Sequence, residues 1–189
     1  MKPLINETYK DYSIRTLRES DVGERYLQWV TDKDVTKFLE IRHNRYKLQD
    51  IVDYVRSFEG DEKRFLVGIF DRRKNLHIGN ATIYDINYYH QTFNFGLLIG
   101  DKDYWGGEAS IAAMLMLFKF SFETLGLRKF FGQGVYANHI KSRFILKKLG
   151  CVEEARLIKK LIFEGQEVDQ VIYTLDRDGW RDMKVKFGV

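Results

Sequence analysis

Residues 93–151 decide the fold: FNFGLLIGDKDYWGGEASIAAMLMLFKFSFETLGLRKFFGQGVYANHIKSRFILKKLGC. Their apolar periodicity predicts, in order, a strand (93–99), a loop, a long apolar helix (about 109–125), a strand (129–135) and a helix (about 138–149) that Gly150 ends. A strand, a glycine turn and a helix in this order aim backbone N–H groups and the positive end of a helix dipole at one place. This arrangement predicts a phosphate site.

The glycine turn lies in the loop of residues 100–110. Gly106 and Gly107 have no side chain and can take positive φ, so a diphosphate can approach the backbone closely. A glycine pair before a helix is also typical of an ordinary turn or cap. The loop alone leaves both interpretations open.

Several motifs occur in a fixed order, namely IGDK (99–102), YWGG (104–107), LGL (125–127), YANHIKS (136–142) and KLGC (148–151). In order and spacing they resemble the GCN5-related N-acetyltransferases (GNAT), over nearly the whole chain. The branch they resemble most contains ribosomal-protein alanine acetyltransferases and amino-sugar acetyltransferases of surface-polysaccharide pathways. The resemblance implies one α/β (α+β) domain over residues 1–189. Its mixed, mostly antiparallel sheet has about seven strands, is flanked by helices and is splayed at the acyl-CoA site.

The resemblance also implies acetyl-CoA as co-substrate, its diphosphate held by a loop that ends in Gly-x-Gly/Ala. Without a gap, Glu108 stands at the second glycine, where its carboxylate would repel the diphosphate. With a loop one residue shorter, Gly107-Glu108-Ala109 supplies Gly-x-Ala and an extra residue falls inside the helix. We prefer this second register on steric grounds. The residues expected at the coenzyme are Leu98, Ile99, Gly100, Tyr104, Trp105, Gly106, Gly107, Glu108, Ala109, Ser110, Asn138 and His139.

In YANHIKS, the asparagine that relatives place near the coenzyme falls at His139, and Asn138 is expected to cap the helix. Leu146 stands where many relatives carry the tyrosine that protonates the departing thiolate, so Ser142 or solvent is expected to supply that proton. Asn94 stands in the strand where relatives often carry Glu, which leaves Asp85 as the best acid nearby. Asp85, Asn94 and Ser142 are therefore the catalytic candidates.

In the resembled family the early helices line the acceptor pocket, so Glu40, Arg42, His43 and Tyr84 are expected to contact the acceptor. A solvated loop is the other interpretation of residues 40–43. A weakly basic amine suits a site without a compelling base, because an α-amine of pKa ~8 loses its proton far more easily than a lysine of ~10.4. We expect a small-molecule amine, first the amino group of a nucleotide-linked sugar. A protein N-terminus and a non-catalytic acyl-CoA-binding role stay open.

The formal charge of +4 and the pI near 9.0 favour anionic ligands, but lysines and arginines do not gather with aromatics in an RNA-binding motif. The single Cys151 excludes an intrachain disulfide and is expected to be a small buried side chain. No signal peptide is apparent, and the longest apolar run (111–118) is too short to span a bilayer. We therefore expect a cytoplasmic protein without a nucleic-acid, membrane or metal partner. The oligomeric state stays open, a homodimer included.

The rest of the chain predicts a mainly antiparallel meander with early helices. Further strands are expected at 12–17, 65–71, 78–87, 157–163 and 168–175, helices at 22–30, 35–40 and 48–58, and a helical turn around Trp180. Ser20 or Asp21 is expected to cap the first helix. Strict alternation in the strand 78–87 would place Ile86 on the face of Tyr84, opposite Ile83 and Asp85.

Overall fold

The computed structural model describes residues 2–189, apart from the side chain of Gln133. Its strands are β1 (Asn6–Tyr9), β2 (Tyr12–Thr16), β3 (Phe65–Asp71), β4 (Leu76–Asn87), β5 (Thr92–Ile99), β6 (Lys129–Tyr136), β7 (Val152–Phe163) and β8 (Gln166–Asp176). Its helices are α1 (Glu24–Thr31), α2 (Lys33–Thr36), α3 (Leu48–Arg56), α4 (Glu108–Lys119), α5 (Ile140–Lys148) and α6 (Arg177–Phe187). Shorter helical turns are η1 (Glu19–Asp21), η2 (Glu40–His43), η3 (Lys102–Tyr104) and η4 (Phe120–Thr124).

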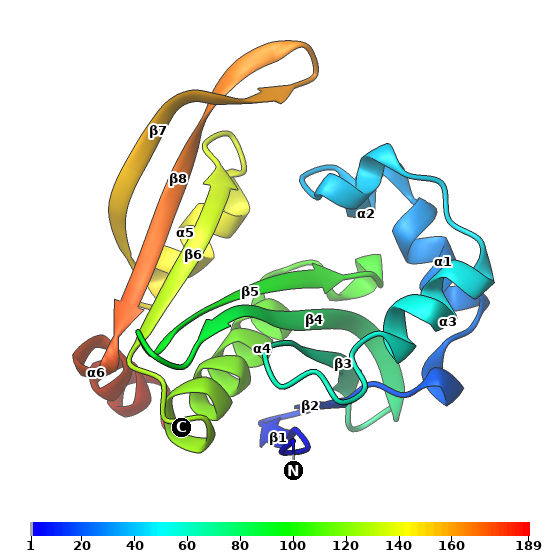
Figure 1. Cartoon of the computed structure of the whole chain (residues 1–189), viewed down its shortest axis with the longest axis horizontal. Coiled ribbons are helices and arrows are strands. Elements are labelled where there is room, and N and C mark those ends of the chain that lie inside the picture. Colours follow the sequence, from blue (N-terminus) through cyan, green and yellow to red (C-terminus); the bar gives the residue numbers. More distant parts are fainter. Residues whose placement is uncertain (1) are drawn as a thin grey trace. The chain divides into compact units, whose positions relative to one another are not determined.

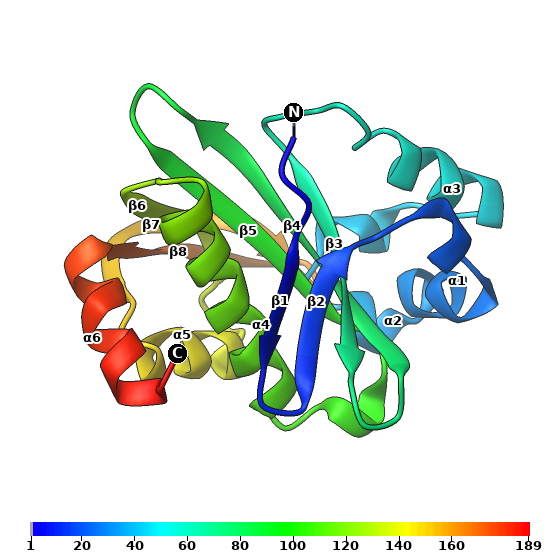
Figure 2. The same ribbon diagram turned by 90° about the horizontal axis from the view of Figure 1, so that it is seen from below.

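Within the described residues the strands follow the order β1-β2-β3-β4-β5-β6-β8-β7, in an open sheet. The pairing of β5 with β6 is parallel, and the β2–β3, β3–β4, β6–β8 and β7–β8 pairings are antiparallel. The predicted mixed, mostly antiparallel sheet with flanking helices is confirmed. One strand was not expected: β1 precedes the predicted first strand and pairs with β2, beside which it runs in Figure 2.

The chain divides into two compact units. The first unit contains the described residues up to Tyr84 together with Phe95–Met116, and the second contains Asp85–Asn94 and Leu117–Val189. Each unit has its own cluster of buried side chains, described in turn below.

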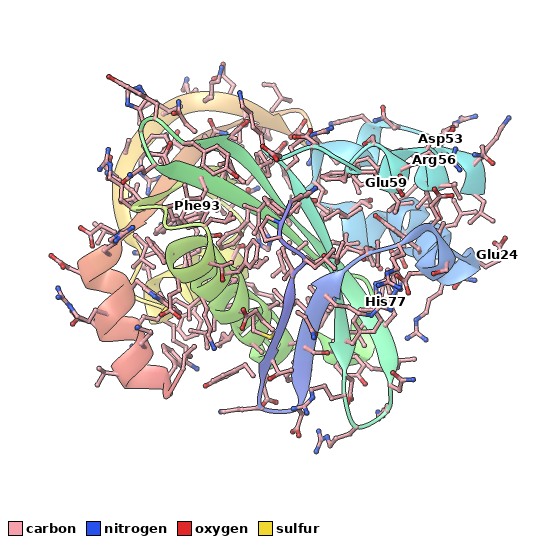
Figure 3. All side chains as sticks on the ribbon, turned by 60° about the horizontal axis from the view of Figure 1, so that its bottom comes forward. Glu24, Asp53, Arg56, Glu59, His77 and Phe93 are labelled. Carbon is pink, nitrogen blue, oxygen red and sulfur yellow. The ribbon has the colours of Figure 1, made fainter. Side chains whose placement is uncertain are left out.

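In the first unit, α1, α2 and α3 lie together (Figure 1), and their apolar residues form a core. The buried members are Leu17, Tyr26, Trp29, Ile51, Val55, Phe58 and Leu66. The apolar stripes predicted for α1 and α3 supply most of them, as expected for amphipathic surface helices. The opposite side of α3 is charged: Asp53 and Arg56 point away from the core (Figure 3), and Arg56 pairs with Glu19 at 2.8 Å.

Helix α1 starts later than predicted. It begins at Glu24 after Gly23, so neither Ser20 nor Asp21 caps it. The Asp21 carboxylate instead accepts the Arg18 backbone N–H at 2.8 Å and closes the turn η1. An Asp carboxylate at this spacing can accept a backbone N–H in a turn as well as at the start of a helix. The sequence therefore indicated a capping interaction correctly but placed it at the wrong element.

Trp29 packs against the backbone at the end of β5. A Cβ on Gly100 would overlap the Trp29 ring, so only glycine fits at this position. Beneath Trp29 lies His77, whose ring meets the Trp29 ring edge to face at 5.0 Å and stacks on Phe70 at 4.8 Å. His77 Nε2 lies 2.9 Å from the Gly79 carbonyl and 2.8 Å from Asn80 Oδ1, so it carries the proton and donates to these acceptors. These contacts fix the position of the Trp29 ring and, through it, the position of the backbone at Gly100.

The alternation predicted for β4 is wrong beyond Tyr84. Asp85 takes a φ of 51°, in the left-handed region, and is exposed. Ile83 and Ile86 are consequently both buried, whereas strict alternation would put them on opposite faces. The sequence gives no warning, because Asp is only one of the residues that tolerate this conformation.

The second unit is built around an aromatic cluster. Phe93 contacts Phe118, Phe122 and Phe130 at ring-centroid distances of 6.4, 5.3 and 5.7 Å. Trp180 stacks on Phe122 at 5.8 Å with an interplanar angle of 11°. Burying Trp180 requires more than the predicted turn, so α6 runs for 11 residues, with Asp176 capping its start through the Gly179 N–H.

Replacing Gly100 by Ala should destabilise the chain by about 2–3 kcal/mol, because the new methyl group must displace the Trp29 ring in a packed core. Gly96→Ala is the matched control, since Gly96 lies on β5 four residues before Gly100 and its Cβ would meet Tyr84 at an ordinary 3.7 Å. Urea denaturation measures both free energies of unfolding. Equal stability of the two variants would contradict the packing described for Trp29.

Candidate active site

Gly107 forms the start of α4 and explains the need for glycine in the loop. Its φ is 96°, a conformation that side chains disfavour, and its carbonyl accepts the Ile111 N–H at 2.8 Å. Helix α4 therefore begins at Glu108. The N–H groups of its first turn have no partner within the helix and lie at the positive end of its dipole. Residues 107–110 therefore have the backbone geometry and the helix-dipole orientation that favour an anion.

The far end of α4 bears on the choice between the two loop registers. After Lys119 the helix continues as the π-helical turn η4, in which the Leu125 N–H reaches back five residues to the Phe120 carbonyl at 3.0 Å. Such a turn accommodates one residue more than α-helix would. An extra helical residue is what the shorter loop requires, so η4 is consistent with Gly107-Glu108-Ala109 as the Gly-x-Ala element.

The Glu108 side chain is exposed, whereas Ala109 is buried. Burial raises the pKa of the Tyr12 phenol, and the nearby Glu108 carboxylate raises it further. A carboxylate in the first helical turn also interacts favourably with the helix dipole.

Tyr104 anchors the loop of residues 100–110 to the end of β3. Its hydroxyl donates to Asp71 Oδ2 at 2.7 Å, and Asp71 Oδ1 accepts the N–H groups of Arg73 and Lys74 at 2.8 and 3.2 Å. These hydrogen bonds, that of Tyr104 first, lower the pKa of the Asp71 carboxyl; burial and then Asp71 raise the pKa of Tyr104 to about 12. Tyr104 thus holds the loop to the end of β3.

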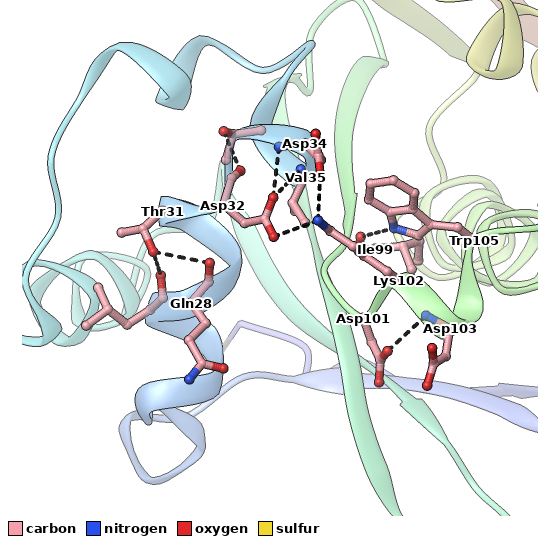
Figure 4. A network of polar contacts seen from close by, with 12 residues as sticks. Gln28, Thr31, Asp32, Asp34, Val35, Ile99, Asp101, Lys102, Asp103 and Trp105 are labelled. Atoms are coloured by element: carbon pink, nitrogen blue, oxygen red, sulfur yellow. Dashed lines mark hydrogen bonds and ion pairs between the residues drawn. The ribbon is translucent and has the colours of Figure 1, made fainter.

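Trp105 and Lys102 fix the same loop to the end of β5 and to the helices α1 and α2 (Figure 4). The Trp105 indole N–H donates to the Ile99 carbonyl at 2.8 Å. Lys102 Nζ lies 2.8 Å from both Asp32 and Asp34, at the junction of α1 and α2. Because two carboxylates already neutralise this ammonium group, backbone N–H groups of α4 are better placed than Lys102 to bind a diphosphate.

A polar hollow of about 300 Å³ lies beside this loop in the first unit. Its lining residues are Arg25, Gln28, Trp29, Asp32, Gly100, Asp101 and Lys102. Arg25 forms an ion pair with Asp101, and Lys102 pairs with Asp32, so the charges of the lining balance each other. The hollow therefore has no net attraction for an ion of either sign.

In the second unit, α5 starts one residue later than predicted. His139, not Asn138, occupies the N-cap position, and its carbonyl accepts the Arg143 N–H at 3.2 Å. Asn138 is exposed, and the expectation that it caps the helix is wrong. Burial lowers the pKa of His139 to about 4, so its imidazole is neutral at pH 7. Ser142 is half-buried on α5, and Leu146 is buried.

The two other catalytic candidates, Asp85 and Asn94, differ in their exposure to solvent. Asp85 is exposed at the left-handed position of β4, where solvent reaches its carboxylate. Asn94 is 2% exposed on β5 between Phe93 and Phe95, both buried. Of the two, only Asp85 is accessible to an acceptor or to water in this structure.

The acceptor candidates belong to the first unit. Glu40, Arg42 and His43 form the turn η2, in which the Arg42 guanidinium donates to the Lys37 carbonyl at 2.8 Å and to His43 Nε2 at 3.1 Å. Residues 40–43 thus form a hydrogen-bonded helical turn, in which Glu40 and His43 are exposed to solvent. Tyr84 lies on β4 and is half-buried.

Sequence reasoning missed three groups that shape this region. Asp71, Trp29 and His77 hold the loop and the strand end, and none of the three was predicted to have this role. Only Asp71 had a local signal, because an Asp before a polar turn accepts N–H groups two and three residues later. The Tyr54 hydroxyl, 3.4 Å from Thr82 Oγ1, was likewise not foreseen.

The family model of the acetyltransferase (GNAT) domain matches residues 12–152. No curated protein matches the sequence. A solved spermidine N-acetyltransferase from Vibrio cholerae, in complex with CoA and spermine, is 17% identical, with a TM-score of 0.80 over 92% of this chain and 99% of that one. A GNAT-family acetyltransferase from Bacillus anthracis is also 17% identical, with a TM-score of 0.77 over 92% and 99%. The chain belongs to the GNAT acetyltransferase family and is an N-acetyltransferase.

Three remaining expectations concern membranes, metals and the cysteine. No helix in the described part of the chain combines the length and the apolar character needed to cross a bilayer. Over the same residues, no group of three or more His, Cys, Asp or Glu side chains is placed to hold a metal ion. Cys151 is buried, which raises the pKa of its thiol to about 12, and the expected small buried side chain is confirmed.

Replacing Gly107 by Ala should lower the free energy of unfolding by about 1–2 kcal/mol, because alanine is strained at positive φ. Gly106→Ala is the matched control: it lies next in the same loop, is not held at positive φ, and its Cβ would meet open space. Its stability should stay within about 0.5 kcal/mol of wild type. Urea denaturation checks both values, and equal stability of the two variants would contradict the cap at Gly107.

The lowered pKa of His139 predicts a pH dependence of stability. The folded chain titrates this group near 4 and the unfolded chain near 6.5, so the unfolded state binds more protons between these values. Its contribution to stability is therefore lost as the pH falls from 6.5 toward 4. His139→Asn should show a smaller drop in Tm between about pH 7 and about pH 5 than wild type. His77, whose pKa is also lowered, is present in both proteins. Parallel Tm profiles would show that His139 is not buried as a neutral group.

Proposed function

We propose that the chain uses acetyl-CoA to acetylate the amino group of a small molecule, and that its two units form one acetyltransferase domain. The observation that supports this most strongly is the start of α4, where Gly107 leaves the first-turn N–H groups open to a diphosphate. The family match at residues 12–152 includes residues of both units. GNAT acetyltransferases use acetyl-CoA, which has such a diphosphate.

The proposed reaction is attack of a neutral amine on the acetyl thioester. Backbone groups near Leu98 and Ile99 would orient the thioester, and backbone N–H groups would stabilise the tetrahedral oxyanion. The register of β5 with β6, Thr92 with Lys129 and Phe93 with Phe130, supports this because it uses the start of β5 and not its end. Collapse of the intermediate expels the thiolate of CoA, which takes up a proton.

The proton transfers need few protein groups if the amine is weakly basic. Deprotonating a lysine-like amine at pH 7 costs about 4–5 kcal/mol, against about 1 kcal/mol for an α-amine. Asp85 is exposed and can accept the amine proton, directly or through water. For the proton that the thiolate takes up, we propose Ser142 of α5 or solvent as the source. We assign Asn94 no proton transfer, because an amide does not titrate.

We further propose a nucleotide-linked amino sugar as the acceptor, as in the amino-sugar branch that the sequence resembles. Around η2, residues 37–47 carry the cations Lys37, Arg42, Arg45 and Lys47 and the single carboxylate Glu40. A cationic segment favours an acceptor with phosphate groups and disfavours a polycation. This argues against assigning a polyamine acceptor to this chain by analogy with the V. cholerae spermidine N-acetyltransferase.

The test is turnover with acetyl-CoA and three acceptors: a UDP- or dTDP-linked amino sugar, a peptide with a free N-terminus, and spermidine. Thiol release is followed in each case. We expect the nucleotide sugar to be acetylated with a kcat/KM at least about tenfold above the other two. A matched sugar without the nucleotide separates recognition of the sugar from recognition of its phosphates.

Each other outcome has a definite meaning. Turnover of the peptide alone would replace the sugar by a protein N-terminus, and turnover of spermidine alone would overturn the argument from the charge around η2. Binding of acetyl-CoA without turnover of any primary amine would favour the non-catalytic acyl-CoA-binding alternative. We propose a cytoplasmic location for all of these functions.

A further inference from the structure

The peptide group that joins Ile99 to Gly100 is held at both of its polar atoms. The Ile99 carbonyl accepts the Trp105 indole N–H at 2.8 Å, and the Gly100 N–H donates to the Ile78 carbonyl at 3.0 Å. The next N–H, that of Asp101, donates to the same Ile78 carbonyl at 3.1 Å. Rotation of this peptide would break these bonds, so its plane is fixed.

The same peptide is also fixed sterically. The Trp29 ring lies so close to Gly100 that no Cβ fits between them, which blocks movement of the strand end toward α1. The Trp105 indole N–H completes the arrangement from the loop. Of the three constraints, only the one from Trp105 comes from the coenzyme loop itself.

Burial does not explain Trp105. Its side chain remains 41% exposed, which is unusual for a residue that serves only as packing. The ring is instead placed by Lys102, whose ammonium group lies 5.7 Å from the ring centroid and is itself held by Asp32 and Asp34 at 2.8 Å. An exposed indole held by a cation and aimed at one carbonyl is suited to orienting that carbonyl.

We propose that Trp105 is a positioning residue for acetyl transfer, which acts through the Ile99 carbonyl and not by contact with the coenzyme. By fixing the Ile99–Gly100 peptide, it fixes the neighbouring backbone groups of Leu98 and Ile99 that orient the thioester. This inference rests on the proposed function. The Ile99 carbonyl and the Gly100 N–H both have hydrogen-bond partners within the chain, so we assign them a structural role in holding this peptide.

The first test removes only the N–H group. Replacing Trp105 by 3-benzothienylalanine keeps the size of the ring but puts sulfur in place of the indole N–H, and Trp105→Phe is the genetically simple companion. We expect kcat to fall about tenfold with little change in the KM for acetyl-CoA. Affinity for adenosine 3′,5′-bisphosphate, which has phosphates but no pantetheine arm, should stay within about twofold.

The matched control is Trp180→Phe, which removes another indole N–H, donated to Glu123 at 3.2 Å in the aromatic cluster of the second unit. This variant should lose stability but keep its kcat. A kcat unchanged by both substitutions at position 105 would overturn the proposal. So would an equal loss of affinity for acetyl-CoA and for the bisphosphate, since Trp105 would then only support the loop.

A second measurement separates this inference from the proposed function. In the ligand-free protein, amide exchange of Gly100 should be at least about tenfold faster in the benzothienylalanine variant, because the fixed peptide gains freedom. Equal exchange would overturn the fixing of the peptide whatever the protein binds. If exchange accelerates but the wild-type protein neither binds nor turns over acetyl-CoA, the proposed function fails and the positioning role fails with it.

Discussion

The contact between the Trp29 ring and Gly100 is the constraint on which the candidate site of the first unit depends. It leaves no space for a side chain at Gly100, so the distance between the end of β5 and the Trp29 ring of α1 is fixed. His77 supports Trp29 from beneath, and its own ring is oriented by Gly79 and Asn80. A core contact between α1 and the end of β5 thus fixes the position of the backbone in the candidate site. Because the core is closely packed, a substitution that shifts this contact also shifts the candidate site.

The loop after β5 shows how a departure from a motif is accommodated. Glu108 would repel a diphosphate if its carboxylate faced the ligand; in the structure it is the exposed first residue of α4, and its charge raises the pKa of Tyr12 after the larger effect of burial. The additional helical residue reappears as the π-helical turn η4 at the other end of the helix. Tyr104 and Trp105 hold the loop through hydrogen bonds to Asp71 and to the Ile99 carbonyl.

Most of the fold could be predicted from the sequence, because strands such as 65–71 and the apolar helix after Gly107 have strong periodicity. The failures lie where one residue changes the register: Asp85 at left-handed φ moves Ile86 to the buried side, and His139 displaces Asn138 from the cap. The short β1 and the full length of α6 depend on tertiary pairing and on burial of Trp180. The candidate site was predicted from glycines and motif order, but its supports, Asp71 and His77, are distant from the loop in sequence, and no motif links them to it.

The most direct test of the account is amide hydrogen exchange of wild-type protein with and without coenzyme A, resolved for the first turn of α4. If the diphosphate binds the backbone there, the N–H groups of Glu108, Ala109 and Ser110 should exchange at least about tenfold more slowly in the complex. Binding that leaves these three amides unchanged and protects others would contradict the account, because the coenzyme would then be held elsewhere. Protection of these amides would establish the start of α4 as the coenzyme site despite Glu108.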